Sequence, residues 1–400
     1  MLVSLLIIFF LGLAAKKLFE QFRLPGLVGL VFVGIATGPF VLNLLEPDFL
    51  VLSTQIRLLA LIIILLRAGL GLDRHVLRRI GATALKMSVL PGIFEGLAVL
   101  VLARFLLGFS WIQGGILGFI LAAVSPAVVV PSMLELRDRG LGMDKDVPLL
   151  ILAGASIDDV FAITVFTAFM GLATGMGHSS PFLGFAMVPV EIAGGVLLGL
   201  LAGFILIHIF NHLSLHRIEE LAVITGAGIV VTLIGQAVSL AGLLGVMSMG
   251  YIFREKAENH AFHLENSLNK LWLVAQLFLF VLIGAAVNIR IAWHAGVMGL
   301  VIITGGLLFR SVGVFLATRG SGLNWNERKF CAAAYLPKAT VQAAVGGLPL
   351  AAGVPGGEVM LAIAVLSIII TAPLGAVAIN RFAPRLLTRS EQSSLSDRQK

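Results

Sequence analysis

Apolar stretches long enough to span a bilayer as helices, about twenty residues each, follow one another along nearly the whole chain. Short polar loops separate them. Charged residues make up 12% of the chain, against about 25% in soluble domains, so nearly all of it must face lipid or another apolar helix. The sequence therefore predicts an all-α, polytopic membrane protein.

Thirteen segments have the length and composition of membrane-spanning helices. We expect them at residues 2–21, 24–42, 52–72, 82–108, 113–136, 146–172, 184–210, 218–238, 240–254, 268–288, 292–318, 328–350 and 358–382.

Most lysines and arginines lie in alternate loops, and basic loops stay in the cytoplasm. These loops are at residues 16–23, 73–86, 137–145, 254–270 and 319–329. We therefore expect a multi-pass protein of the cell (inner) membrane, with its N-terminus outside and its C-terminus cytoplasmic. Because Met1 opens directly into an apolar run with no basic segment before it, we expect a first spanning helix rather than a cleaved signal peptide.

The two halves of the chain repeat each other. Residues 24–34 align with 240–250, and residues 121–131 align with 332–342, at offsets between 211 and 216. We expect one membrane-embedded transporter unit, divided into a first repeat, a connector helix, a second repeat and a short cytoplasmic tail at residues 1–172, 184–210, 217–384 and 385–400. Matching positions are separated by six helices and one connector, so the second copy enters the membrane from the opposite side. Inverted repeats of this kind place the binding site near the bilayer midplane.

Prolines interrupt two of the predicted helices at equivalent positions of the repeats. Pro126 and Pro131 lie in the span 113–136, and Pro337 lies in the span 328–350. Proline lacks a backbone donor and clashes with the preceding turn, so we expect all three to break their helices. The matched positions predict crossed, discontinuous helices whose ends bring partial charges to the centre of the membrane.

Asp158 and Asp159 adjoin in an otherwise apolar helix. A carboxylate at this depth costs about 2.5 kcal/mol or more, and a transported cation or proton is the simplest reason to keep two. Ser156 lies on the same face as Asp159, and Ser125 lies at the predicted break in the fifth helix. We take these four residues as candidate cation and proton ligands, because alkali cations prefer oxygen. A purely structural pair, buried against basic partners, is the alternative.

Three further charges lie inside predicted helices. Arg310 and Glu95 belong to equivalent helices of the two repeats, and we expect a buried ion pair between them. Lys338 follows the proline of the twelfth helix, where it has two interpretations: compensation of exposed carbonyl ends, or a part in transport.

Several other classes of protein fit the sequence less well. The net charge of +7 is spread over loops rather than gathered on one face, which argues against nucleic-acid binding. A single cysteine, Cys331, excludes an intramolecular disulfide. An intramembrane aspartyl protease needs carboxylates from two helices, whereas these aspartates adjoin on one. A gated cation channel remains an alternative to a carrier.

Four motifs together resemble the cation/proton antiporter superfamily, and within it the NHA type of sodium/proton exchanger. They span residues 66–73, 125–132, 154–160 and 336–343. The resemblance implies a homodimer embedded in membrane lipid that exchanges Na⁺ or Li⁺ for H⁺ by an elevator-type movement. It further implies no enzymatic activity and no cofactor, and it makes Asp159 the principal ion-binding carboxylate. K⁺/H⁺ exchange on the same scaffold is the alternative.

Three positions bear on stoichiometry, and two of them depart from the family pattern. Asp158 is not a departure: it matches a position that is aspartate in many electrogenic relatives and asparagine in many electroneutral ones. Arg310 stands where several electrogenic relatives have lysine, and Ser125-Pro126 replaces a Thr-Asp pair. Because arginine effectively never releases its proton, Arg310 is not expected to carry one. Stoichiometry stays open at this point.

Overall fold

A computed structural model describes residues 2–22, 24–71, 74–174, 181–213, 215–238 and 240–389 of the chain. Within these ranges, the side chains at 74–80, 138, 156, 160, 181–189 and 292–295 are not described. The described residues form helices and loops without a strand, and one isolated β-bridge joins Leu141 to Arg389. Ten helical stretches among them are long and apolar enough to cross a membrane. The predicted all-α, polytopic fold is thus confirmed.

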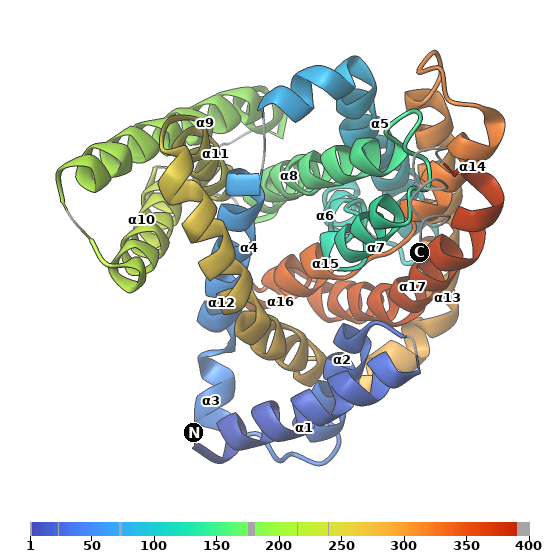
Figure 1. Cartoon of the computed structure of the whole chain (residues 1–400). Helices are drawn as coiled ribbons and strands as arrows, with labels where there is room; N and C mark the ends of the chain where they lie inside the picture. The colour runs from blue at the N-terminus through green and yellow to red at the C-terminus, as the bar shows by residue number, and fades with distance from the viewer. Residues whose placement is uncertain are drawn as a thin grey trace. The chain divides into compact units, whose positions relative to one another are not determined.

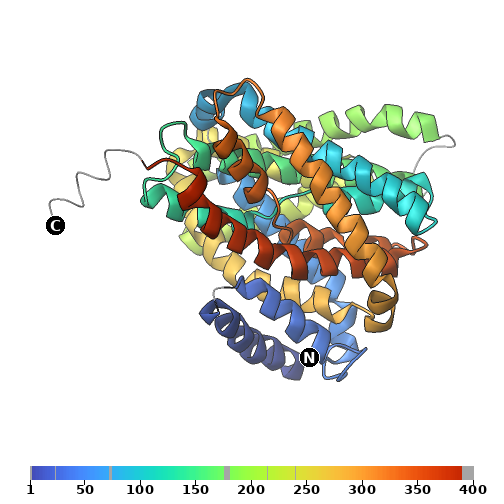
Figure 2. The same cartoon turned by 90° about the vertical axis from the view of Figure 1, so that its right-hand side faces the viewer.

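The chain forms two compact units. The first unit comprises Met1–Pro47, Ile80–Phe166 and Phe280–Lys400, and the second comprises Asp48–Arg79 and Thr167–Leu279. The helices of the first unit are α1 (Leu2–Gln21), α2 (Gly26–Thr37), α6 (Trp111–Leu121), α7 (Pro126–Asp138), α13 (Ile289–Ala317), α14 (Trp325–Ala334), α15 (Thr340–Val345), α16 (Leu348–Ala351) and α17 (Gly357–Leu386). Figure 2 shows α13 crossing α17 within this unit.

The second unit contains α4 (Ser53–Gly71), α9 (Pro181–His212), α10 (Arg217–Ala237) and α11 (Gly242–Lys256). A short helix, α3 (Pro47–Val51), precedes α4. Three long helices contribute to both units: α5 (Arg74–Leu106), α8 (Val147–Thr174) and α12 (Glu258–Ala285). Helix α5 bends at Gly81, whose φ of +61° belongs to the region that favours glycine.

Most predicted spans coincide with a helix, because apolar length alone marks a crossing. The span 2–21 matches α1, and the spans 52–72 and 146–172 match α4 and α8 to within two residues at each end. The number thirteen stays a prediction, since α2 with 12 residues and α11 with 15 are shorter than a full crossing.

Two of the spans are interrupted at the centre, as the matched prolines predict. Helix α6 ends at Leu121 and α7 begins at Pro126, whereas α14 ends at Ala334 and α15 begins at Thr340. The helices before the breaks, α6 and α14, both begin with a capping box. In α6 the Ser110 hydroxyl accepts from the Gln113 amide, and the Gln113 side chain accepts from the Ser110 amide at 2.7 Å.

The same capping arrangement recurs 214 positions later, at the start of α14. The Asn324 side chain accepts from the Glu327 amide at 2.9 Å, and Glu327 accepts from the Asn324 amide at 2.7 Å. A capping box satisfies two backbone donors that a helix start would otherwise leave unpaired. The capping residues therefore determine where both helices start. The distance between these two starts in the sequence falls within the range of offsets found between the repeats.

The prediction that Pro131 breaks its helix is wrong. Helix α7 runs without interruption from Pro126 to Asp138 and includes Pro131. Proline holds φ near −65°, which is compatible with a helix, and it removes one backbone hydrogen bond rather than a whole turn. Pro126 acts differently because it lies at the first helical position, where its missing donor has no partner to lose. Pro337 lies in the non-helical segment between α14 and α15.

Glycines set the close packing of the second unit, in which α9 lies along α11 (Figure 1). A Cβ added to Gly199 of α9 would overlap the backbone carbonyl of Gly245 of α11, and one added to Gly245 would lie 2.8 Å from the carbonyl oxygen of Gly195. Small residues let membrane helices approach until their backbones touch. The separation of α9 and α11 therefore depends on the absence of side chains here.

We expect Gly199→Ala to destabilise the purified protein by about 1–3 kcal/mol, because the added methyl group meets backbone that cannot move aside. Thermal unfolding in detergent measures the change. Gly226→Ala in α10 is the matched control, since a Cβ there meets no atom within 4 Å. Equal unfolding temperatures for the two variants would contradict the role of Gly199.

Candidate functional site

The two interrupted helices touch at their breaks. The amide of Ser125, in the gap between α6 and α7, donates to the carbonyl oxygen of Pro337, in the gap between α14 and α15, at 2.8 Å. Helix ends leave carbonyls and amides without partners inside the helix, and in an apolar interior each must find another one. The contact therefore brings two sets of freed backbone groups to one place.

Side chains from the second half of the chain satisfy the carbonyls at the end of α6. The Gln342 side-chain amide donates to the carbonyl oxygens of Ile120 and Ala123, both at 3.0 Å. Arg310 of α13 donates to the carbonyl oxygen of Ala122. The Gln342 amide also lies 3.5 Å from the carbonyl oxygen of Leu121, so two polar side chains contact four carbonyls at the break.

The freed amides near the breaks are also paired. The Val124 amide donates to Asp158 Oδ2 at 2.8 Å, and the Lys338 amide donates to Thr371 Oγ1 of α17 at 2.9 Å. A hydrogen bond from a backbone amide to a carboxylate is charge-assisted and stronger than one between neutral groups. The break in the first helix thus holds one of the two predicted aspartates in place.

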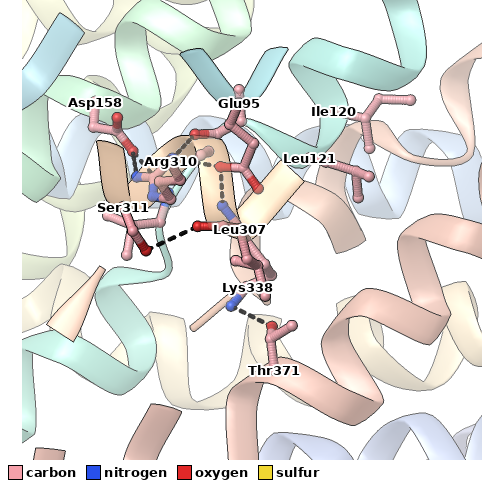
Figure 3. A network of polar contacts seen from close by, with 12 residues as sticks. Glu95, Ile120, Leu121, Asp158, Leu307, Arg310, Ser311, Lys338 and Thr371 are labelled. Atoms are coloured by element: carbon pink, nitrogen blue, oxygen red, sulfur yellow. Dashed lines mark hydrogen bonds and ion pairs between the residues drawn. The ribbon is translucent and has the colours of Figure 1, made fainter. Parts of the chain in front are cut away.

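Four charged side chains form a continuous buried network (Figure 3). Arg310 donates to Asp158 Oδ2 at 2.8 Å and to Glu95 Oε2 at 2.7 Å, and Lys338 Nζ lies 2.6 Å from the same Glu95 oxygen. Each of the four is at most 2% exposed. Buried charges persist when they are paired and their remaining hydrogen-bonding groups are satisfied, as these largely are.

Asp159 differs from its neighbour. It is 7% exposed, and its Oδ1 has no hydrogen-bond partner among the described residues, nor do Asp158 Oδ1 and the Ser125 hydroxyl. Among the described residues, Arg310 and Lys338 form ion pairs with Asp158 and Glu95 but not with Asp159. Oxygen atoms with unused lone pairs are suited to bind a proton or an alkali cation.

The charges of the region do not cancel. With every group ionised, Glu95, Asp158 and Asp159 contribute three negative charges, and Arg310 and Lys338 contribute two positive ones. One negative charge remains in a place where net charge is costly. A single proton or a single monovalent cation would neutralise it.

Residues 5–383 match the family model for the transmembrane sodium/hydrogen exchanger. The chain belongs to this family. Exchangers of this kind are cation/proton antiporters, and the ten apolar helices make this one a multi-pass membrane protein embedded in lipid.

Relatives and solved structures support the assignment. The chain is 35% identical to human sodium/hydrogen exchanger 9B2 over 98% of its own length and 76% of the relative, and 33% identical to the mouse protein of that name over 98% and 74%. The structure of the sodium proton antiporter MjNhaP1 from Methanocaldococcus jannaschii is similar with a TM-score of 0.80, at 21% identity over 95% of this chain and 97% of that chain. The antiporter fold expected from the sequence is confirmed.

The structure brings most of the predicted residues of this exchanger together. The ion pair expected between Arg310 and Glu95 is present, and Lys338 extends it. Ser125 lies where the broken helices touch. The side chain of Ser156 lies outside the described residues. The roles of these residues in transport stay predictions.

Sequence reasoning missed two residues that complete the polar network, Gln342 and Thr371. Both are buried in apolar helices, and neither carries a charge that would single it out. Gln342 lies five positions after Pro337, within reach of the exposed carbonyls, so its spacing from the proline is the signal that would have found it.

Removal of one charge from the network should be more harmful than removal of a matched pair. We expect Glu95→Gln to lower the free energy of unfolding by about 3 kcal/mol, since Lys338 and Arg310 both lose a carboxylate partner. The double variant Glu95→Gln/Lys338→Met restores the net charge of the region and should recover part of the loss. Thermal unfolding of detergent-purified variants measures both effects, and a double variant less stable than Glu95→Gln would refute the pairing.

Proposed function

We propose that this exchanger carries Na⁺ or Li⁺ in one direction and H⁺ in the other, with Asp159 as the principal binding carboxylate and Asp158 beside it. The observation that carries the proposal is the uncancelled negative charge of the buried network, together with the unpartnered Oδ1 of Asp159. Ser125 adds an unpartnered hydroxyl near the break, and Ser156 is proposed as a further ligand from its position in the sequence.

Exchange then follows from competition for one site. A proton on Asp159, or a cation bound by the two aspartates, makes the region neutral, and neutral loaded forms can reorient within the membrane. The unloaded form keeps one negative charge away from water, and this cost discourages reorientation without cargo. The two fluxes are thereby coupled without any further gate.

The same charge balance supports a stoichiometry of one cation for one proton. Arg310 already neutralises Asp158 and cannot donate a proton of its own. One loading event is therefore enough to remove the remaining charge, whether a proton or a cation provides it. We accordingly propose electroneutral exchange.

Movement of the site is proposed to be of the elevator type. The charged network and both breaks belong to the first unit, so that unit can carry the site as one body. We further propose a homodimer in the cell membrane with a cytoplasmic C-terminus, on the basis of the family resemblance and the basic alternate loops.

We expect Asp159→Asn to abolish cation-dependent proton flux, because the remaining charges of the region already cancel and no group is left to exchange. The measurement is dequenching of a pH-sensitive dye in proteoliposomes after addition of Na⁺, Li⁺ or K⁺. Asp48→Asn, an exposed acid in α3, is the control and should leave flux unchanged. Flux retained by Asp159→Asn would rule out the assigned role. If the wild-type protein gave flux with K⁺ but not with Na⁺ or Li⁺, the transported cation would be K⁺.

Electroneutral exchange predicts a rate that does not respond to membrane potential. We expect the wild-type rate under an imposed pH gradient to be the same whether K⁺ and valinomycin clamp the potential at zero or at an inside-negative value. Because protons compete for the same carboxylates, the Na⁺ concentration for half-maximal rate should rise as the pH falls. A rate that changes severalfold with potential would show that the ratio is not one to one.

A further inference from the structure

Tyr335 is a buried polar residue that the exchange mechanism above does not use. It follows the last residue of α14, at the start of the second break, and is 0% exposed. Its hydroxyl has no hydrogen-bond partner among the described residues. Burial of an unpaired hydroxyl costs about 1–3 kcal/mol, and phenylalanine would avoid that cost in the same space. The hydroxyl therefore calls for an explanation other than packing.

The hydroxyl lies directly against the helix that carries both aspartates. A Cβ added to Gly154 of α8 would overlap the Tyr335 hydroxyl oxygen, so the glycine provides the space that the oxygen occupies. Gly154 precedes Asp158 by four residues, one turn of helix, which places the two positions on the same face. The hydroxyl is thus within about one helical turn of the carboxylate.

The unpartnered oxygen of Asp158 faces the same neighbouring helix, α5. A Cβ at Gly92 of α5 would lie 3.5 Å from Asp158 Oδ1, and a Cβ at Gly154 would lie 3.1 Å from the Cβ of Met87 of α5. Both α8 positions therefore face α5. Two oxygens without partners among the described residues, Tyr335 Oη and Asp158 Oδ1, therefore lie on the side of α8 that faces α5.

Two neighbouring features leave oxygen atoms available to another ligand. Arg310 binds Asp158 through Oδ2 and lies over the Tyr335 ring, with 5.2 Å from Cζ to the ring centroid, so Oδ1 is left for another ligand. Pro91 lies inside α5 and has no N–H to donate to the carbonyl of Met87, four residues earlier. That carbonyl therefore lacks the donor that a regular helix would give it.

We propose that the Tyr335 hydroxyl is a neutral oxygen ligand of the transported alkali cation, acting with Asp158 Oδ1, and that Gly154 is required to make room for it. This assignment rests on the proposed cation/proton exchange. A dehydrated alkali cation needs several oxygens, and a neutral one contributes to the shell without changing the charge balance. Tyr335 thereby affects cation binding selectively and leaves the proton-loaded form unaltered.

The test is Tyr335→Phe, which deletes one oxygen atom and keeps the ring over Arg310. The expected result is an increase of about tenfold in the Na⁺ concentration for half-maximal exchange, with the maximal rate preserved, because one interaction with a charged group is lost. The assay is dye dequenching by full-length protein in proteoliposomes. Tyr251→Phe, at the other tyrosine of the chain, is the matched control and should behave as wild type.

Thermal unfolding separates a ligand from a packing residue. Without its unpaired hydroxyl, Tyr335→Phe should be more stable than wild type in choline chloride, but it should gain less stability on transfer to NaCl of equal ionic strength. An unchanged gain, together with an unchanged half-maximal concentration, would overturn the proposal. A wild-type protein that neither exchanges nor is stabilised by any alkali cation would instead refute the proposed exchange itself.

Gly154 offers a second, independent variant. Gly154→Ala should displace the hydroxyl and raise the half-maximal Na⁺ concentration to a similar extent. In the double variant Gly154→Ala/Tyr335→Phe the nearest ring carbon would lie 3.5 Å from the new methyl group, and the only close contact left would be the one of 3.1 Å with the Met87 Cβ. The half-maximal Na⁺ concentration of the double variant should therefore match that of Tyr335→Phe alone. Losses that multiply in the double variant would show that the two residues act separately and would contradict the proposal.

Discussion

The structure of this exchanger depends on pairing charges and freed backbone groups where no water is available. Two interrupted helices expose carbonyls and amides in an apolar interior, and the side chains that satisfy them also carry most of the charge. Arg310 is at the centre, since it contacts Asp158, Glu95 and the carbonyl of Ala122 at once. Its planar guanidinium can serve three acceptors in fixed directions, which an ammonium group could not do equally well. The hydrogen bonds of Arg310 therefore hold both the end of the broken helix α6 and the charged side chains in place.

This arrangement makes two adjacent aspartates unlike each other. Asp158 has one oxygen committed to Arg310 and to the Val124 amide, whereas no ion pair holds Asp159 among the residues that the structure describes. Because neighbours on a helix differ by about 100° in direction, one acid can complete the structural network while the other stays available for cargo. In the proposed mechanism, Asp158 thus provides a fixed charge and Asp159 an exchangeable one. The proposed stoichiometry follows directly from that division.

The sequence predicted the spans, the matched breaks and the charged residues because each has a strong local signal. Apolar length marks a crossing, and a charge inside such a length is conspicuous. Pro131 was misinterpreted because proline removes one bond without requiring that a helix end. Thr371 and Tyr335 could not be assigned in advance, since neutral polar residues occur in membrane helices for many reasons, and for Gln342 the spacing from Pro337 was the one available signal. Their surroundings depend on which atoms the fold brings together, and periodicity does not contain that information.

The contact between Ser125 and Pro337 joins residues 212 positions apart. A ribosome that feeds this chain into a membrane releases the first interrupted helix long before residues 310–342 exist. Until they arrive, the carbonyls of Ile120 and Ala123 lack the glutamine that will cover them. During that interval these carbonyls need other partners, such as water, because an apolar interior offers none. Completion of the proposed binding site is thus among the last events of biogenesis, because it needs residues from both halves of the chain.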